Sequence, residues 1–101
     1  MDKLAGFRSE LNAVDAEIVR LLGRRYGICR AVAHYKREHG IPMMQPGRVA
    51  EVKERCAQMA REHGMDPDFA RRLYGMIIDE ACRMEDEIID DPVVQLASPA
   101  R

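Results

Sequence analysis

The sequence predicts an all-α fold with three helices per chain, the first of them very long. Apolar residues recur at helical spacing along most of the chain, and segments with glycine and proline interrupt this spacing near residues 40–47 and 64–67. A composition with 47% apolar residues, five aromatic residues and no Trp favours helix packing over a sheet sandwich. The 101 residues allow one domain. We expect a helical domain over residues 1–91 and a frayed tail over residues 92–101.

The first helix is expected from Asp2 to Glu38, with Gly40 as a left-handed C-terminal cap and Pro42 just beyond it. Its seam follows two columns of residues seven apart, which are Leu4, Leu11, Ile18, Arg25 and Val32, and Phe7, Val14, Leu21, Ile28 and Tyr35. At ~1.5 Å per residue the helix would be about 55 Å long, too long for a compact monomer. Because a long apolar seam needs a cover of similar length, we expect a homodimer in which the nine apolar seam residues are packed.

Two shorter helices should follow. The second is expected from Pro46 to about His63, and Gly64 ends it. Its apolar stripe consists of Val49, Val52, Cys56 and Met59. The third should start at Asp66-Pro67, which suit an N-cap and a first helical turn, and end near Asp91. Its predicted buried face consists of Phe69, Leu73, Ile77, Met84 and Ile88.

Composition and charge indicate a cytoplasmic protein without a nucleic-acid or membrane partner. The formal net charge is −1, which gives no support for general binding to nucleic acid or to an anionic membrane. The sequence contains three cysteines, which are Cys29, Cys56 and Cys82. Because an odd number cannot all pair within one chain, we expect reduced thiols. The N-terminus lacks the apolar stretch of a signal peptide, and no apolar run approaches the ~20 residues of a membrane span.

Several kinds of catalytic site are not indicated by the sequence. His34, His39 and His63 have no metal-ligand spacing to one another or to a cysteine pair. There is no glycine-rich phosphate loop, and neither Ser9 nor Ser98 lies in a nucleophile motif. We therefore expect no metal and no cofactor. An enzyme with these residues would act through positioning and electrostatics.

Arg25 is a charged residue within an apolar seam. A buried guanidinium stays charged and needs an anion, supplied either by a ligand or by Asp15 or Glu17 of a neighbouring helix. Lys36 lies eleven residues after Arg25, which on an α-helix corresponds to about 20° in direction and ~16 Å along the axis. The two cations therefore face the same side of the helix and could bind the two ends of a small dianion. Arg8 lies roughly 25 Å from Arg25 and could reach only a partner's site. Taken singly, each of these cations could also be a solvated surface group.

One face of the third helix could meet this cationic region. Tyr74, Ile78, Ala81 and Glu85 follow a spacing of four, three and four residues and share that face. Glu85 is either a surface charge in the acidic run 85–87 or a hydrogen-bond donor in the pocket when protonated. Burial would raise its pKa and nearby cations would lower it, so both alternatives stay open.

Residues 4 to 89 resemble the all-helical chorismate mutase family. The motif that carries the resemblance is Leu4-x-x-Phe7-Arg8-x-x-Leu11-x-x-Val14-Asp15-x-x-Ile18-x-x-Leu21-Leu22-x-Arg24-Arg25, followed by Lys36, Arg48 and Ile77-Ile78. The resemblance implies an interlaced dimer with two equivalent sites, each completed by an arginine of the opposite chain. That arginine would be Arg8, which accounts for its distance from Arg25.

The resemblance also implies site roles. Arg8 from the partner and Arg25 would bind the carboxylates of a dicarboxylate substrate, and Arg48 would support its anionic end. Lys36 would contact the enolpyruvyl ether oxygen and a carboxylate, and protonated Glu85 would donate to the ether oxygen. The implied reaction is a pericyclic rearrangement that needs positioning and stabilisation of charge on that oxygen.

Three substrate-binding positions depart from the common family pattern. Val49 replaces a glutamate that in many chorismate mutases accepts a hydrogen bond from the substrate's C4 hydroxyl group. Gln45 replaces an acidic residue of the same loop, and Ala81 replaces a small hydroxyl residue. Ile78 belongs to the matching motif and is expected to contact substrate.

Residues 41–49 resemble the 4-amino-4-deoxychorismate mutases that feed p-aminophenylalanine into antibiotic pathways. An arginine followed by valine also occurs in the related isochorismate-pyruvate lyases. We rank rearrangement of 4-amino-4-deoxychorismate first, rearrangement of chorismate second and the lyase reaction third. The alternative is a non-enzymatic protein, a helical dimerisation or adaptor module whose charged side chains are solvated.

Overall fold

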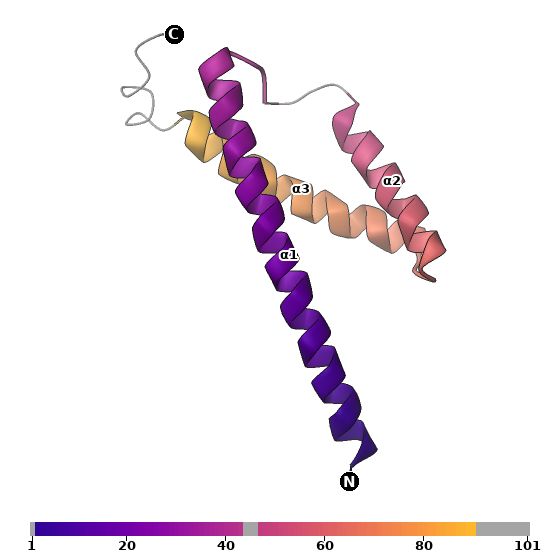
Figure 1. Cartoon of the computed structure of the whole chain (residues 1–101). Helices are drawn as coiled ribbons and strands as arrows, with labels where there is room; N and C mark the ends of the chain where they lie inside the picture. Colours follow the sequence, from indigo (N-terminus) through magenta and orange to yellow (C-terminus); the bar gives the residue numbers. More distant parts are fainter. Residues whose placement is uncertain (1, 44–46, 91–101) are drawn as a thin grey trace.

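The computed structural model describes residues 2–43 and 47–90, which form three α-helices (Figure 1). These are α1 (Lys3–His39), α2 (Arg48–Glu62) and α3 (Pro67–Asp90). The described ranges contain no strand, so the prediction of an all-α fold with a very long first helix is confirmed. The expectations for Pro46 and for the tail over residues 92–101 fall outside the described residues. No helix in the described ranges is long and apolar enough to span a bilayer.

The ends of α1 are set by local hydrogen bonds. The Asp2 side chain accepts a hydrogen bond from the Leu4 backbone N–H at 3.0 Å, which caps the first turn. At the other end Gly40 adopts φ 64°, and the Ile41 N–H donates to the Lys36 carbonyl at 2.8 Å. The helix has 37 residues, and the longest dimension of the chain is 63 Å. The predicted boundaries are confirmed to within one residue.

Helix α3 packs against both α1 and α2, and within the described residues the backbones of α1 and α2 do not pack against each other. It crosses α1 near the C-terminal part of that helix, as Figure 1 shows. The core is small and rich in alanine, which lets the helix axes approach closely. Its members are Ala33 of α1, Val52, Cys56, Ala57 and Ala60 of α2, and Ala70, Ile77 and Ala81 of α3.

Polar contacts fix the helices at their crossings. The Tyr26 hydroxyl group of α1 donates to the Ile77 carbonyl of α3 at 3.2 Å. Arg71 of α3 forms an ion pair with Glu54 of α2 at 2.7 Å. The turn between α2 and α3 places Gly64 at φ 72°, a left-handed conformation that favours glycine. These contacts and the alanine core hold α2, α3 and the end of α1 as one unit.

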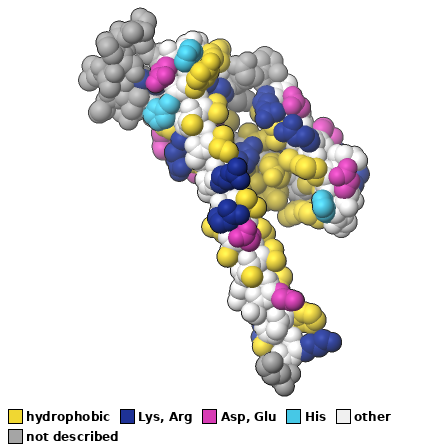
Figure 2. All heavy atoms as spheres, viewed as in Figure 1, with side chains coloured by type: hydrophobic (Ala, Val, Ile, Leu, Met, Phe, Trp, Pro, Cys, Tyr) yellow, Lys and Arg dark blue, Asp and Glu magenta, His cyan; other side chains and the backbone are white. Residues whose placement is uncertain are grey.

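The N-terminal half of α1 projects from this unit, and its apolar side chains are uncovered (Figures 1 and 2). All nine apolar seam residues are exposed, and they are Leu4, Phe7, Leu11, Val14, Ile18, Leu21, Ile28, Val32 and Tyr35. A single chain therefore leaves the seam uncovered, and the packing of these residues in a homodimer stays a prediction.

The predicted stripes of the shorter helices are also only partly buried in one chain. Val52, Cys56 and Ile77 are buried, whereas Met59 of α2 and Phe69 and Leu73 of α3 are exposed. A single chain thus leaves apolar surface on α1, α2 and α3.

We predict that Ala57→Leu destabilises the fold. Ala57 is fully buried in the core of α2 and α3, so a larger side chain forces the helices apart at a cost of about 1–3 kcal/mol. Urea unfolding followed by circular dichroism would measure the loss. Ala50→Leu is the matched control, because Ala50 lies exposed on the same helix. Equal unfolding midpoints for both variants would show that Ala57 does not set the helix spacing.

Candidate active site

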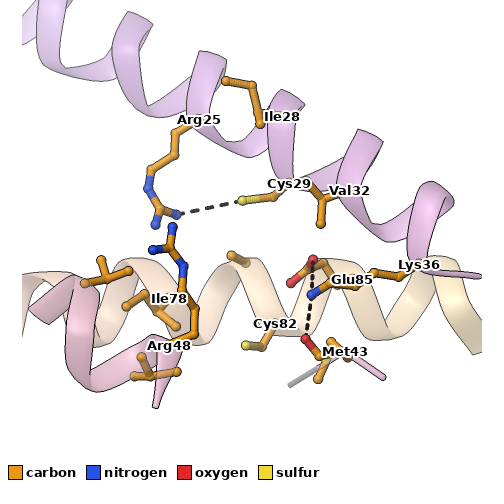
Figure 3. Close-up of a pocket in the computed structure, with 13 residues that line it drawn as sticks. Arg25, Ile28, Cys29, Val32, Lys36, Met43, Arg48, Ile78, Cys82 and Glu85 are labelled. Atoms are coloured by element: carbon orange, nitrogen blue, oxygen red, sulfur yellow. Dashed lines mark hydrogen bonds and ion pairs between the residues drawn. The ribbon is translucent and has the colours of Figure 1, made fainter. Parts of the chain in front are cut away.

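A pocket of about 320 Å³ lies where the three helices meet, and it contains most of the residues singled out from the sequence (Figure 3). Seven predicted site residues line it, namely Arg25, Lys36, Arg48, Val49, Ile78, Ala81 and Glu85. Figure 2 shows basic side chains gathered around the hollow between α1 and α2. The prediction that Arg25 and Lys36 face the same side of one helix is confirmed by their places in this pocket.

Helical spacing explains how the lining is assembled. On α1 the residues Arg25, Cys29, Val32 and Lys36 are separated by four, three and four positions, so they form one face. On α3 the residues Ile78, Ala81 and Glu85 are separated by three and four positions and also form one face. The first turn of α2 supplies Arg48 and Val49. Its N-cap, Gly47, makes no side-chain capping hydrogen bond, so the positive end of the helix dipole adds to the cationic character of the pocket.

Arg25 and Arg48 form one end of the pocket. Their guanidinium groups point toward one another from α1 and α2 (Figure 3). Arg48 also forms an exposed ion pair with Glu51 at 2.9 Å. Within the described residues Arg25 has no ion pair with an acidic side chain, and Glu17 instead pairs with Arg20 at 2.9 Å. Two converging cations without a carboxylate between them form a site for an anionic group.

Lys36 and Glu85 form the other end. The Lys36 ammonium group donates to the Met43 carbonyl at 2.6 Å and lies 4.0 Å from the Glu85 carboxyl group. Only 16% of the Lys36 side chain and 10% of the Glu85 side chain is exposed. The alternative that Glu85 is a surface charge is therefore wrong, because α1 covers it. Burial raises the pKa of Glu85, while Lys36 opposes that rise, Asp86 adds to it and Arg25 opposes it.

This arrangement has a chemical consequence. A raised pKa keeps the Glu85 carboxyl group protonated to a higher pH than an ordinary glutamate, and the protonated form can donate a hydrogen bond. Lys36 uses one ammonium hydrogen for the Met43 carbonyl, which leaves donors for a ligand. The pocket thus presents donors at both ends and apolar walls between them.

Two predicted site residues are not brought into this pocket. Arg8 is exposed on the projecting half of α1 and is not among the lining residues. Gln45 lies outside the described residues. The sequence pattern did not identify the other residues that line the pocket, which are Ile28, Cys29, Val32, Met43, Val52 and Cys82. Cys29 could have been found from its helical spacing to Arg25, whereas Met43 contributes a backbone carbonyl that no residue pattern reveals.

We predict that Glu85→Gln becomes more stable relative to the wild type as pH rises. The folded state raises the Glu85 pKa, so the stability from the protonated carboxyl group is present below the unfolded pKa and is lost as pH rises through the folded pKa. The difference in urea midpoint should therefore grow above pH of about 4.3, the ordinary glutamate value. Glu87→Gln is the control, because Glu87 is exposed on the same helix. A constant difference across pH would contradict burial of a protonated Glu85.

Comparisons with known proteins identify relatives of this chain. The 4-amino-4-deoxychorismate mutase of Streptomyces pristinaespiralis is 47% identical over 88 residues, which cover 87% of this chain and 68% of that protein. The 4-amino-4-deoxychorismate mutase of Streptomyces venezuelae is 44% identical over 88 residues, covering 87% of this chain and 85% of that protein. The isochorismate pyruvate lyase of Pseudomonas aeruginosa is 37% identical over 76 residues, covering 74% of this chain and 73% of that protein.

A family profile also matches most of the chain. Residues 7–86 match the profile described as chorismate mutase type II. This range includes all three helices in large part and every residue that lines the pocket. The resemblance seen in the sequence is therefore confirmed, and the chain belongs to the chorismate mutase type II family.

Proposed function

We propose that the protein catalyses the rearrangement of 4-amino-4-deoxychorismate to 4-amino-4-deoxyprephenate. The observation that carries the proposal is the pocket with Arg25 and Arg48 at one end and Lys36 with Glu85 at the other. The choice of substrate is supported by the identity of 47% and 44% to two proteins named for that activity. The protein is then an intramolecular transferase, acting in the cytoplasm in the synthesis of compounds derived from p-aminophenylalanine.

The mechanism we propose uses positioning and electrostatics. In the rearrangement the ether C–O bond breaks as a C–C bond forms, so no nucleophile is needed. Arg25 and Arg48 would hold substrate carboxylates, which fixes the flexible side chain near its reactive geometry. Lys36 and protonated Glu85 would donate to the ether oxygen, where negative charge grows in the transition state.

Apolar residues would contact the substrate ring. Val49, Ile78 and Ala81 line the pocket, and Val49 stands beside Arg48 where a carboxylate would accept a hydrogen bond from a C4 hydroxyl group. Val49 cannot accept a hydrogen bond from a C4 hydroxyl group or from a C4 amino group, so the order of the two substrates rests on the identity to the two named mutases, and we rank chorismate second. The lyase reaction ranks third, and the 37% identity to the Pseudomonas aeruginosa protein is the observation that keeps it in consideration. We also propose that Gln45 binds substrate.

The exposed apolar side chains support a homodimer. Nine seam residues of α1 are exposed together with Met59, Phe69 and Leu73 in a single chain. Such a surface is larger than scattered apolar residues on a soluble monomer and indicates an interface. A second copy that covers α1 would bring the exposed Arg8 to the partner's pocket, where it would bind a carboxylate. A dimerisation module without catalysis would share this surface but would not need the cationic pocket.

We predict that Arg25→Ala lowers kcat/KM for 4-amino-4-deoxychorismate by at least about 10²- to 10³-fold, because it removes a charge-assisted contact. Arg24→Ala is the matched control, since Arg24 is exposed and does not line the pocket. Wild-type protein should be assayed in parallel with chorismate and isochorismate, with identification of products. A higher kcat/KM for chorismate, or release of pyruvate as the preferred outcome, would overturn the substrate proposed here.

A second prediction tests whether Arg8 completes the partner's site. Arg8→Ala and Arg25→Ala homodimers should each be nearly inactive. Co-refolding equal amounts should restore about a quarter of wild-type activity, because half of the dimers would be mixed and each would hold one intact site. Arg24→Ala mixed with Arg25→Ala is the control for refolding, and it should keep about half of wild-type activity whether or not subunits exchange. Absence of restored activity in mixed dimers, confirmed by mass spectrometry, would show that Arg8 does not act across the interface.

A further inference from the structure

The contacts of Arg25 differ from those of the other pocket cations. Arg48 pairs with the Glu51 carboxylate at 2.9 Å, and Lys36 contacts both the Met43 carbonyl and Glu85. Arg25 instead contacts sulfur and an aromatic ring. One of its guanidinium nitrogens lies 3.8 Å from the Cys29 sulfur, and its central carbon lies 5.9 Å from the centroid of the Tyr74 ring. The Cys29 contact is visible in Figure 3.

These two contacts restrain a cation without cancelling its charge. The face of an aromatic ring attracts a cation through its quadrupole, and a thiol sulfur accepts only a weak hydrogen bond. A carboxylate in the same place would form a bidentate ion pair and neutralise the guanidinium, as Glu54 of α2 does for Arg71 of α3. The charge of Arg25 thus stays available to a ligand.

Tyr74 is itself held in place. It is part-buried on α3, and burial together with the neighbouring Cys56 thiol of α2 raises the pKa of its phenol. Cys56 belongs to the core. The Tyr74 ring therefore remains uncharged at neutral pH, and its position depends on the packing between α2 and α3. Through this ring the packing of two helices is coupled to the orientation of Arg25 on the third.

We infer that Tyr74 and Cys29 are positioning residues that orient the Arg25 guanidinium and leave its charge free for a substrate carboxylate. The inference rests on the proposed function, in which Arg25 binds such a carboxylate. Cys29 lies four residues after Arg25 on α1, so it restrains the side chain from its own helix. Tyr74 restrains it from α3. Neither residue needs to touch the reacting atoms.

The ring is tested with Tyr74→Phe and Tyr74→Leu. Phenylalanine keeps the aromatic face, so kcat and KM should stay within about twofold of wild type. Leucine removes the face, and KM for 4-amino-4-deoxychorismate should rise about five- to thirtyfold, with a smaller change in kcat because carboxylate binding acts on ground state and transition state alike. Equal KM values for the two variants, or a loss confined to kcat, would overturn the role of Tyr74.

The role of Cys29 is tested with Cys29→Asp and Cys29→Asn, because aspartate and asparagine have similar shapes but differ in charge. Aspartate would pair with Arg25 and raise KM at least about tenfold, whereas asparagine would leave most of the affinity. If both variants bind substrate equally, the free charge of Arg25 is not the property that Cys29 preserves. This pair also keeps the proposal testable if Tyr74→Leu fails to fold.

An NMR measurement that does not depend on catalytic turnover tests the positioning of Arg25 separately from the proposed function. The side-chain N–H signal of Arg25 in a ¹H–¹⁵N spectrum, identified by its loss in Arg25→Lys, should be shifted by the ring current of Tyr74. The shift should persist in Tyr74→Phe and vanish in Tyr74→Leu. If the shift behaves in this way but the wild type turns over none of the three substrates, the proposed function fails and the positioning of Arg25 stands. A signal unaffected by Tyr74→Leu overturns the positioning itself.

Discussion

The close packing of α3 on its two neighbours is the contact on which the pocket depends. Within the described residues α3 is the element that touches both α1 and α2, and small residues such as Ala33, Ala57 and Ala81 occupy these crossings. Small side chains bring helix axes together, so long polar side chains from three helices can reach a common space. Without this spacing the cations of α1 and α2 would lie on separate surfaces and would act as ordinary solvated groups.

The electrostatic balance of the lining residues makes the pocket suited to an anion. Three cations line it, and Glu85 is the acidic residue among the described lining. Because burial raises the pKa of Glu85, this carboxyl group offsets less positive charge than a fully ionised one would. Positive charge is therefore concentrated in one small volume, although the chain as a whole carries a formal net charge of −1. A local field of this kind can bind a dianion without making the surface generally basic.

The sequence predicted the helices and most of the candidate residues that line the pocket, because both follow the helical period. Arg25 and Lys36 could be assigned to one side of α1 from their eleven-residue separation, and Gly40 marked the end of that helix. Burial could not be predicted in the same way. The period identifies an apolar stripe on a helix, but it does not say whether the stripe is covered by the same chain, so Phe69 and Leu73 were expected in the core and are exposed. The environment of Glu85 also depends on the crossing of α1 and α3, which is a tertiary property.

The separation between the alanine core and the exposed seam of α1 has a consequence for how substitutions affect this chain. The seam residues are exposed in a single folded chain, so a polar substitution at Leu11 or Val14 removes no contact between its own helices. The hydrophobic gain of these side chains is realised only when something else covers them. Folding of one chain and association of that chain therefore draw on different residues, and each can change through mutation largely independently of the other.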